Sequence, residues 1–347
     1  MRSGDRMTHH PDTGLPQRVA LGVLLRSFPP AHVDLVLDAA DRREQRQRLL
    51  PARLMVYFTL GMWIFKALSY EQILGEILSN APGLALPGAV DEPASAAAIG
   101  RARRRLGVEP LRLLFEQAAG TFPLPAPASF RGLRPLWLRR VEVGVPATPA
   151  NLAGFGGSAR TRMSVLIEDF TGRVISADVA DASDLPERVF SGVALDDSML
   201  IMDERPLSAR LWTAVERLGV EQLWPLEERQ KPASAGRLPD GSTLAKLTAD
   251  DGSELVARVF ARPGGSPARL ATSILDHRLA PAAELAALYD ARPAGADFDA
   301  IAARRVGDVL ELRSKDPEMV RQELYAMLCV HHAIGDLVNS VPPHLSQ

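Results

Sequence analysis

Four arginines crowd into one short stretch of predicted helix, and their side chains have the chemistry to bind phosphate. The stretch is 95–115, SAAAIGRARRRLGVEPLRLLF, and its arginines are Arg101, Arg103, Arg104 and Arg105. A guanidinium group donates paired hydrogen bonds to phosphate oxygens, so the cluster suits contacts with a nucleic-acid backbone. The same residues would equally suit the solvated surface of an ordinary helix, and the sequence leaves both interpretations open.

Two other groupings of reactive side chains lack the spacing that their chemistry needs. Cys329 precedes His331 and His332 on one predicted helix. Adjacent helical residues diverge by about 100°, so these side chains share no metal-binding face. The glycine-rich segment 152–158 has neither the spacing nor the lysine of a phosphate-binding loop. Neither grouping predicts a metal centre or a nucleotide site.

Sequence patterns in two distant parts of the chain point to one known family. The C-terminal part contains the pair Tyr289-x2-Arg292, then LRSK at 312–315 and VRQEL at 320–324. The N-terminal part contains LPARLMVYFTLGMWIF, LSYEQIL and ARRRLGVEPLRLLF in that order. The chain therefore resembles the IS4-type bacterial insertion-sequence transposases over roughly residues 45–340, most densely at both ends and at Ser198–Trp212.

The resemblance implies a three-carboxylate site of which this chain keeps one acid. In the family, a mixed sheet of ribonuclease-H type brings three acids together around two divalent metal ions for DNA strand cleavage and transfer. The match makes Asp203 the middle acid. It places the first-acid position at Arg139, followed by Arg140, and the last-acid position at Ala296.

Losing two acids changes the expected metal chemistry. Mg²⁺, which is expected for the family, is a hard ion that prefers oxygen ligands. Asp203 alone would be a weak ligand at most, so we expect no Mg²⁺ to be bound here. Glu142 is the only acid near the first position, and Asp297 and Asp299 are the local substitutes for the last one.

Three functional hypotheses follow from the resemblance. The first is a catalytically inactive member of the transposase family that acts as a DNA-binding or domesticated regulatory protein. The second is an active, metal-dependent transposase whose acids are displaced, and the third is a decaying relic. The implied partner is DNA, at transposon ends or derived sites, with a homodimer as a further possibility. The predicted DNA contacts are the four arginines of 95–115 together with Tyr289 and Arg292.

Composition limits these hypotheses only weakly. The 347 residues carry a formal net charge of −2, so any DNA contact must come from a local patch rather than from a global positive field. One cysteine excludes an internal disulfide. The longest apolar run, Leu54–Phe65, is too short to span a bilayer, and residues 1–14 lack the apolar core of a signal peptide. We expect a cytoplasmic protein without membrane contact.

The predicted fold class is α+β or α/β. A disordered N-terminus (1–15) precedes a helical domain (16–120), a Pro-rich linker (121–130) and a ribonuclease-H-like, DDE-transposase-type domain (131–347) with a β-rich insertion at about 222–268. Residues 16–48 read as helical with a break at Pro29-Pro30, and the mixed charge run Asp41–Arg48 reads as a solvated helix face. Residues 163–167 and 174–179 predict a hairpin.

Overall fold

The computed structural model describes residues 14–44, 46, 48–84, 94–120, 130–180, 186–193, 195, 197–228, 230, 232–248, 254–265, 268–291, 305–306 and 309–340. The chain divides into two compact units, each described by itself below. The first comprises residues 1–115, 301–303 and 318–347, and the second comprises residues 116–300 and 304–317.

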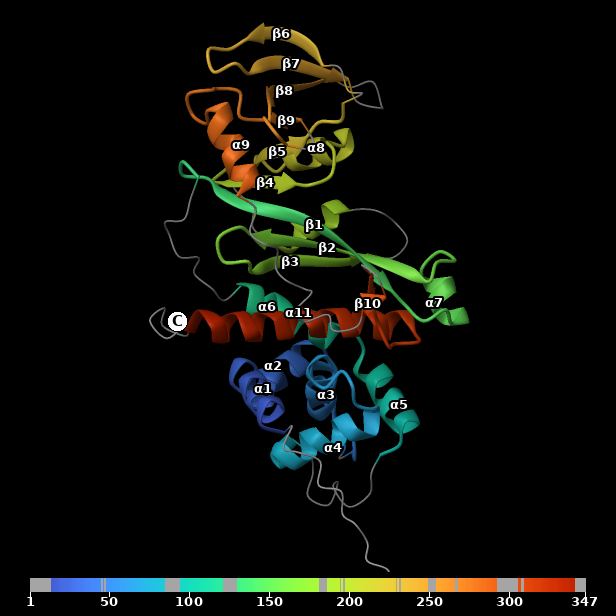
Figure 1. The fold of residues 1–347 in the computed structure, drawn as a ribbon. Helices are drawn as coiled ribbons and strands as arrows, with labels where there is room; N and C mark the ends of the chain where they lie inside the picture. The colour runs from blue at the N-terminus through green and yellow to red at the C-terminus, as the bar shows by residue number, and fades with distance from the viewer. Residues whose placement is uncertain are drawn as a thin grey trace, which may run out of the picture. The chain divides into compact units, whose positions relative to one another are not determined.

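Helices alone build the described part of the first unit (Figure 1). Helices α6 and α11 each extend beyond the unit at one end. The helices are α1 (Gly14–Ser27), α2 (Pro30–Ala39), α3 (Ala52–Ile64), α4 (Tyr70–Asn80), the 3-10 turn η1 (Pro82–Leu84), α5 (Ala96–Leu106), α6 (Glu109–Gly120) and α11 (Pro317–Ser340).

Helix α3 is the core of this unit because its sequence is apolar nearly all round. Eleven of its residues are buried, and Trp63 donates its indole N–H to the carbonyl of Glu323 in α11 at 2.7 Å. The next helix, α4, begins with a capping box at Ser69. Ser69 accepts a hydrogen bond from the N–H of Gln72, and the Gln72 side chain accepts one from the N–H of Ser69. This reciprocal capping box satisfies two N–H groups that would otherwise lack partners at the helix start.

The mixed charge run after α2 is not helical, which corrects the sequence-based prediction. Helix α2 ends at Ala39, and the described residues between it and α3 form turns, bends and irregular backbone. Asp41 has a positive φ of 52°, a conformation that ends a helix and turns the chain. The charged side chains therefore line a loop that folds back toward α5. The predicted break at Pro29-Pro30 is confirmed, since α1 ends at Ser27 and α2 begins at Pro30.

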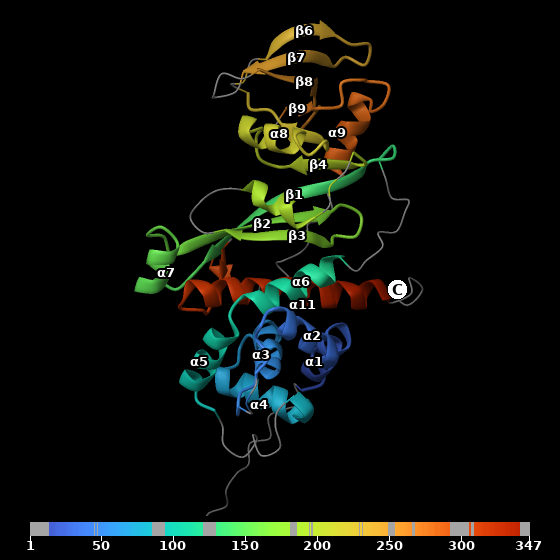
Figure 2. The same cartoon turned by 180° about the vertical axis from the view of Figure 1, so that it is seen from behind.

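A long mixed sheet builds the second unit (Figure 2). Its path runs β10-β11-β1-β4-β5-β9-β8-β7-β6, and β2 and β3 continue from the other edge of β1. The strands are β1 (Arg134–Gly144), β2 (Arg160–Glu168), β3 (Val174–Ala180), β4 (Met199–Asp203), β5 (Glu221–Pro225), β6 (Ala233–Arg237), β7 (Thr243–Thr248), β8 (Glu254–Ala261), β9 (Arg269–Thr272), β10 (Arg305–Val306) and β11 (Val309–Glu311). The remaining elements are α7 (Pro149–Gly154), the 3-10 segment η2 (Pro186–Gly192), α8 (Ala209–Glu216) and α9 (Ala282–Asp290).

The centre of this sheet has the strand order β3-β2-β1-β4-β5. Strand β2 is antiparallel to β1 and to β3, whereas β4 lies parallel to β1 and to β5. This is the arrangement of a ribonuclease-H-like sheet, and the antiparallel strands β6–β9 extend it beyond β5. The predicted fold class, a helical N-terminal region followed by a mixed-sheet domain with added β structure, is confirmed. The predicted hairpin is also confirmed, as β2 and β3.

Strand β1 is long enough to take two partners on the same edge. Strand β2 occupies one edge of β1 from Leu136 to Gly144. On the other edge, β4 pairs with β1 only as far as Leu138, and β11 pairs with it at Val143 and Gly144. Between these two pairings, the described residues place no strand beside β1 on that edge. Arg139 and Arg140 lie in this interval.

Within the described part of the chain, no single helix is long and apolar enough to cross a membrane. The bent pair Val19–Ser27 and Pro30–Ala39 reaches the required length and apolarity only when its two helices, which meet at 52°, are taken together.

Candidate functional site

The retained acid of the predicted site lies at the C-terminal end of β4, beside β1. The register pairs Asp203 with Leu138. Side chains alternate between the two faces of a sheet, so Leu138 and Arg140 share the face on which Asp203 lies. The Arg140 Nη2 atom is 2.5 Å from the Asp203 Oδ2 atom. A cation therefore lies directly against the one retained carboxylate.

The Asp203 carboxylate is buried and both of its oxygens have hydrogen-bond donors. Its side chain is 3% exposed and that of Arg140 is 12% exposed. The Oδ1 atom accepts a hydrogen bond from the backbone N–H of Arg205 at 2.8 Å. Burial raises the pKa of Asp203, while the Arg140 guanidinium and the Arg205 N–H act in the opposite direction by favouring the ionised form.

A second ion pair lies across the same strand ends, with the other arginine. Arg139 points to the opposite face of β1 from Arg140, and it forms an ion pair with Glu204. Its guanidinium carbon also lies 5.6 Å from the ring centre of Trp137, which is two residues earlier on the same face. Arg139, the predicted first-acid position, is therefore not the residue that faces Asp203. Arg140 holds that place.

Tyr289 fixes the end of β4 from within the core. Its hydroxyl donates a hydrogen bond to the backbone carbonyl of Asp203 at 3.0 Å, and its ring centre lies 5.3 Å from that of Trp137. The residue is 1% exposed, so its side chain is not accessible to DNA in this structure. Tyr289, a DNA contact in the sequence-based prediction, therefore lies in the core of its unit. Arg292 and Ala296, with Asp297 and Asp299, lie outside the described residues.

The described donor set does not fit the metal ions that the family resemblance implies. Divalent ions of the Mg²⁺ type need several oxygen ligands with open lone pairs. Here the Asp203 oxygens already accept from Arg140 and Arg205, and the neighbouring acid Glu204 is bound to Arg139 on the other face. The positive charge of Arg140 also repels a cation at this place. In the described ranges, no three His, Cys, Asp or Glu residues are grouped to hold a metal ion.

The pKa of Asp203 makes stability depend on pH. An acid whose pKa is raised on folding binds its proton more tightly in the folded state, so it lowers stability as pH rises from the unfolded pKa of about 3.9 through the folded pKa. Arg140→Met removes a cation that lowers the pKa of Asp203, so the folded-state pKa rises further. The pH range over which Asp203 costs stability therefore extends to higher pH. We expect the stability deficit of Arg140→Met relative to wild type to grow from acid to neutral pH in urea titrations. A deficit that is equal at all pH values would contradict this account.

The predicted arginine cluster on α5 does not face one way. Arg101, Arg104 and Arg105 are exposed. Arg103 is 0% exposed, and its guanidinium donates to the Gln322 side chain, the Tyr70 hydroxyl and the Met319 carbonyl. Its side chain is therefore not accessible to a phosphate, and we do not carry Arg103 forward as a DNA contact. Arg105 donates to the Leu50 carbonyl at 2.8 Å and lines a cavity described below.

Sequence reasoning missed the partner of Asp203. It placed Arg139 in the first-acid position, followed by Arg140, without assigning either side chain to a face of the sheet. Alternation along β1 was the available signal, but it assigns a face only when the β1–β4 register is known. That register depends on pairing between strands about sixty residues apart, which a single sequence does not specify.

Comparison with known proteins agrees with this architecture. Residues 18–116 match the family model described as the insertion element 4 transposase N-terminal domain. Over 327 residues the chain is 27% identical to the transposase InsG for insertion sequence element IS4 of Escherichia coli (strain K12), covering 86% of this chain and 72% of that protein. A solved piggyBac transposase synaptic complex with hairpin DNA aligns over 93% of this chain and 74% of that one, with 11% identity and a TM-score of 0.39, too low to carry an argument.

The helical domain matches a transposase family model, and a mixed sheet with an acid at the end of β4 follows it. Within that class, the matched domain and the relative agree on one family. Residues 18–116 therefore resemble the N-terminal domain of IS4 insertion-sequence transposases, and most of the chain is similar to one such transposase.

Proposed function

We propose that this chain is an IS4-family protein that binds DNA in the cytoplasm, at transposon ends or sites derived from them, without cleaving it. The observation that carries the proposal is the ion pair between Arg140 and Asp203. Metal-dependent strand transfer needs carboxylates that are free to hold divalent ions. In this chain a guanidinium occupies the place beside the retained acid, and the two groups form an ion pair.

The charge at this point favours a structural role for Asp203. A buried carboxylate is costly unless it is paired, and Arg140 supplies the pairing. A metal ion would have to displace that guanidinium and leave it buried without an anion. Loss of cleavage therefore follows from the same contact that holds the ends of β1 and β4 together.

The support for DNA binding comes from the family and from the helical unit. The relative of this chain is named as a transposase of an insertion element, and the matched model covers the helical N-terminal domain. Arg101, Arg104 and Arg105 are exposed on α5 within that domain. Because the net charge of the chain is −2, binding should depend on such a local basic surface rather than on the overall charge.

DNA binding without cleavage is the expected result for the purified full chain. Labelled DNA that flanks its own gene would be titrated across a salt series, with and without Mg²⁺, and the strands then separated on a denaturing gel. We expect sequence-preferring binding whose affinity falls steeply with salt, because Lys and Arg contacts release condensed counterions. We expect the same affinity with and without Mg²⁺, and no nicked product.

Two outcomes would overturn parts of the proposal. Mg²⁺-dependent nicking that disappears in Asp203→Asn would show an active enzyme whose other acids lie elsewhere in the chain. Absence of binding at any salt concentration would remove the DNA-binding function and leave a relic. Asp203→Asn is the appropriate control because it keeps the shape of the side chain while removing its charge.

A further inference from the structure

A cavity in the first unit is lined mainly by arginines. Its volume is about 380 Å³, and it lies between the loop that follows α2 and the C-terminal end of α5. Five arginines and two acids line it, with a few apolar residues beneath. We call it the arginine pocket; the residues that matter for its chemistry are Glu44, Arg46, Arg48 and Arg105.

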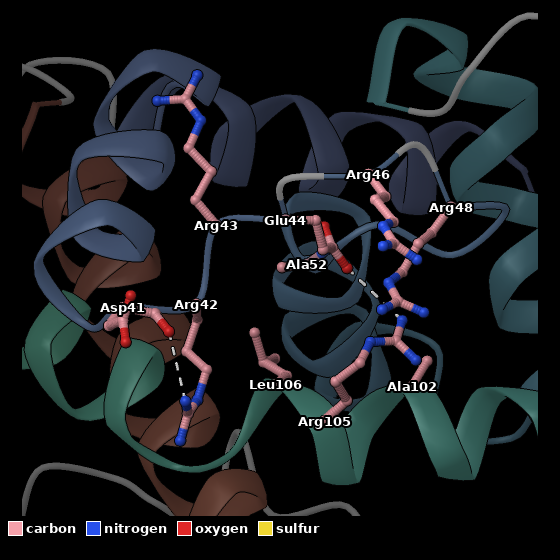
Figure 3. Close-up of a pocket in the computed structure, with 10 residues that line it drawn as sticks. All are labelled: Asp41, Arg42, Arg43, Glu44, Arg46, Arg48, Ala52, Ala102, Arg105 and Leu106. Atoms are coloured by element: carbon pink, nitrogen blue, oxygen red, sulfur yellow. Dashed lines mark hydrogen bonds and ion pairs between the residues drawn. The ribbon is translucent and has the colours of Figure 1, made fainter.

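Three of these guanidinium groups converge. Figure 3 shows the side chains of Arg46, Arg48 and Arg105 gathered beside the Glu44 carboxylate, while Arg43 points away from them. Arg105 lies 3.6 Å from Glu44 and donates to the Leu50 carbonyl. Arg46 and Arg48 have no hydrogen-bond or ion-pair partner within the described part of the chain. Like charges brought together in this way repel one another unless an anion joins them.

Glu44, the carboxylate beside these three guanidinium groups, also binds the start of a helix. Glu44 accepts a hydrogen bond from the backbone N–H of Ala52, the first residue of α3, at 2.8 Å. It therefore caps a helix start, where the helix dipole favours negative charge. A single carboxylate shared between a helix end and three guanidinium groups leaves the arginine pocket with excess positive charge, and Asp34 and Asp38 are already paired with Arg43.

We propose that the arginine pocket binds a backbone phosphate of DNA. Guanidinium groups hold phosphate oxygens bidentately, and Arg46 and Arg48 are exposed and have no ion-pair partner among the described residues, so both can reach a polyanion. The exposed Arg101 lies four residues before Arg105 on α5, on the same helix face, which extends the basic surface from the pocket along the helix. A strand of DNA offers successive phosphates to such a surface, whereas a free phosphate would use only the pocket. The inference rests on the proposed DNA-binding function and assigns residues to it.

The test compares Arg46→Gln, Arg48→Gln and the double variant with wild type in DNA titrations across a salt series. Each lost phosphate contact should reduce the slope of log affinity against log salt by about 1. We expect each single variant to bind roughly tenfold more weakly at low salt, since charge-assisted contacts to phosphate are the strong ones. Arg43→Gln removes the same charge from the same loop, and we expect it to keep the wild-type slope.

The outcomes distinguish an error in the pocket assignment from an error in the proposed DNA binding. If wild type binds DNA and the double variant keeps its affinity and slope, the pocket assignment is wrong while DNA binding stands. If wild type does not bind, the proposed function itself is wrong. A titration with inorganic phosphate at constant ionic strength tests whether the pocket binds a free phosphate ion instead of DNA. Saturable thermal stabilisation that disappears in the double variant, without any change in DNA binding, would identify a small-anion site instead.

Discussion

Arg140→Met should destabilise the protein by about 3–5 kcal/mol, the cost of removing one partner of a buried ion pair. The variant leaves the Asp203 carboxylate buried with the Arg205 N–H as its remaining donor among the described residues, because the guanidinium 2.5 Å away is lost. Methionine fills a similar volume, so the expected loss comes from the uncompensated charge rather than from a cavity. Urea denaturation at neutral pH, read by circular dichroism and tryptophan fluorescence, measures the change.

Two further variants separate charge from packing. Arg140→Met combined with Asp203→Leu removes both charges, and it should recover most of the lost stability because a buried pair can often be replaced by apolar residues at little cost. Arg160→Met removes an arginine from the exposed pair with Glu142, and its effect should stay below about 1 kcal/mol. If Arg140→Met were no worse than Arg160→Met, the Asp203 pair would not hold the strand ends together.

Residues of the motifs that carry the family resemblance form hydrogen bonds inside each unit. Asn151 donates its side-chain N–H to the carbonyl of Ser314 in the LRSK motif at 3.1 Å, and the Thr148 hydroxyl donates to the carbonyl of Lys315 at 2.8 Å. In the first unit, Gln322 of the VRQEL motif accepts from Arg103 of the ARRRL motif and donates back to the Arg103 carbonyl. Sequence patterns at these positions therefore report packing as well as chemistry.

Local signals predicted individual elements well, whereas non-local pairing was not predictable. The helix break at Pro29-Pro30 and the β2–β3 hairpin each depend on a few adjacent residues. The faces of Arg139 and Arg140 depend on strand register. The packing of α11 within the helical unit depends on contacts more than two hundred residues apart, such as that between Trp63 and Glu323. Such contacts cannot be predicted from local sequence patterns, because they depend on which distant segments pack together in the folded chain.

The sequence also could not predict which arginine of α5 is buried. Spacing alone could not separate Arg103 from its neighbours, because all four arginines have the same chemistry. Helical geometry turns Arg103 inward, toward α4 and α11, and leaves Arg101 exposed. A buried arginine is expected where several acceptors converge, and here Gln322, Tyr70 and the Met319 carbonyl supply them. The difference between the two residues can be measured.

Arg103→Met should cost about 3 kcal/mol of stability, because buried acceptors that lose a charged donor remain unsatisfied. Gln322 would lose the donor to its side-chain oxygen, 2.8 Å away, and the Met319 carbonyl would lose one at 3.2 Å. Arg101→Met on the exposed side of α5 should change stability by less than about 0.5 kcal/mol. DNA titrations below the unfolding midpoint give the second readout. The folded Arg103→Met protein should keep the wild-type salt slope, since its guanidinium faces the core. A reduced slope with unchanged stability would instead return Arg103 to the DNA-contacting surface.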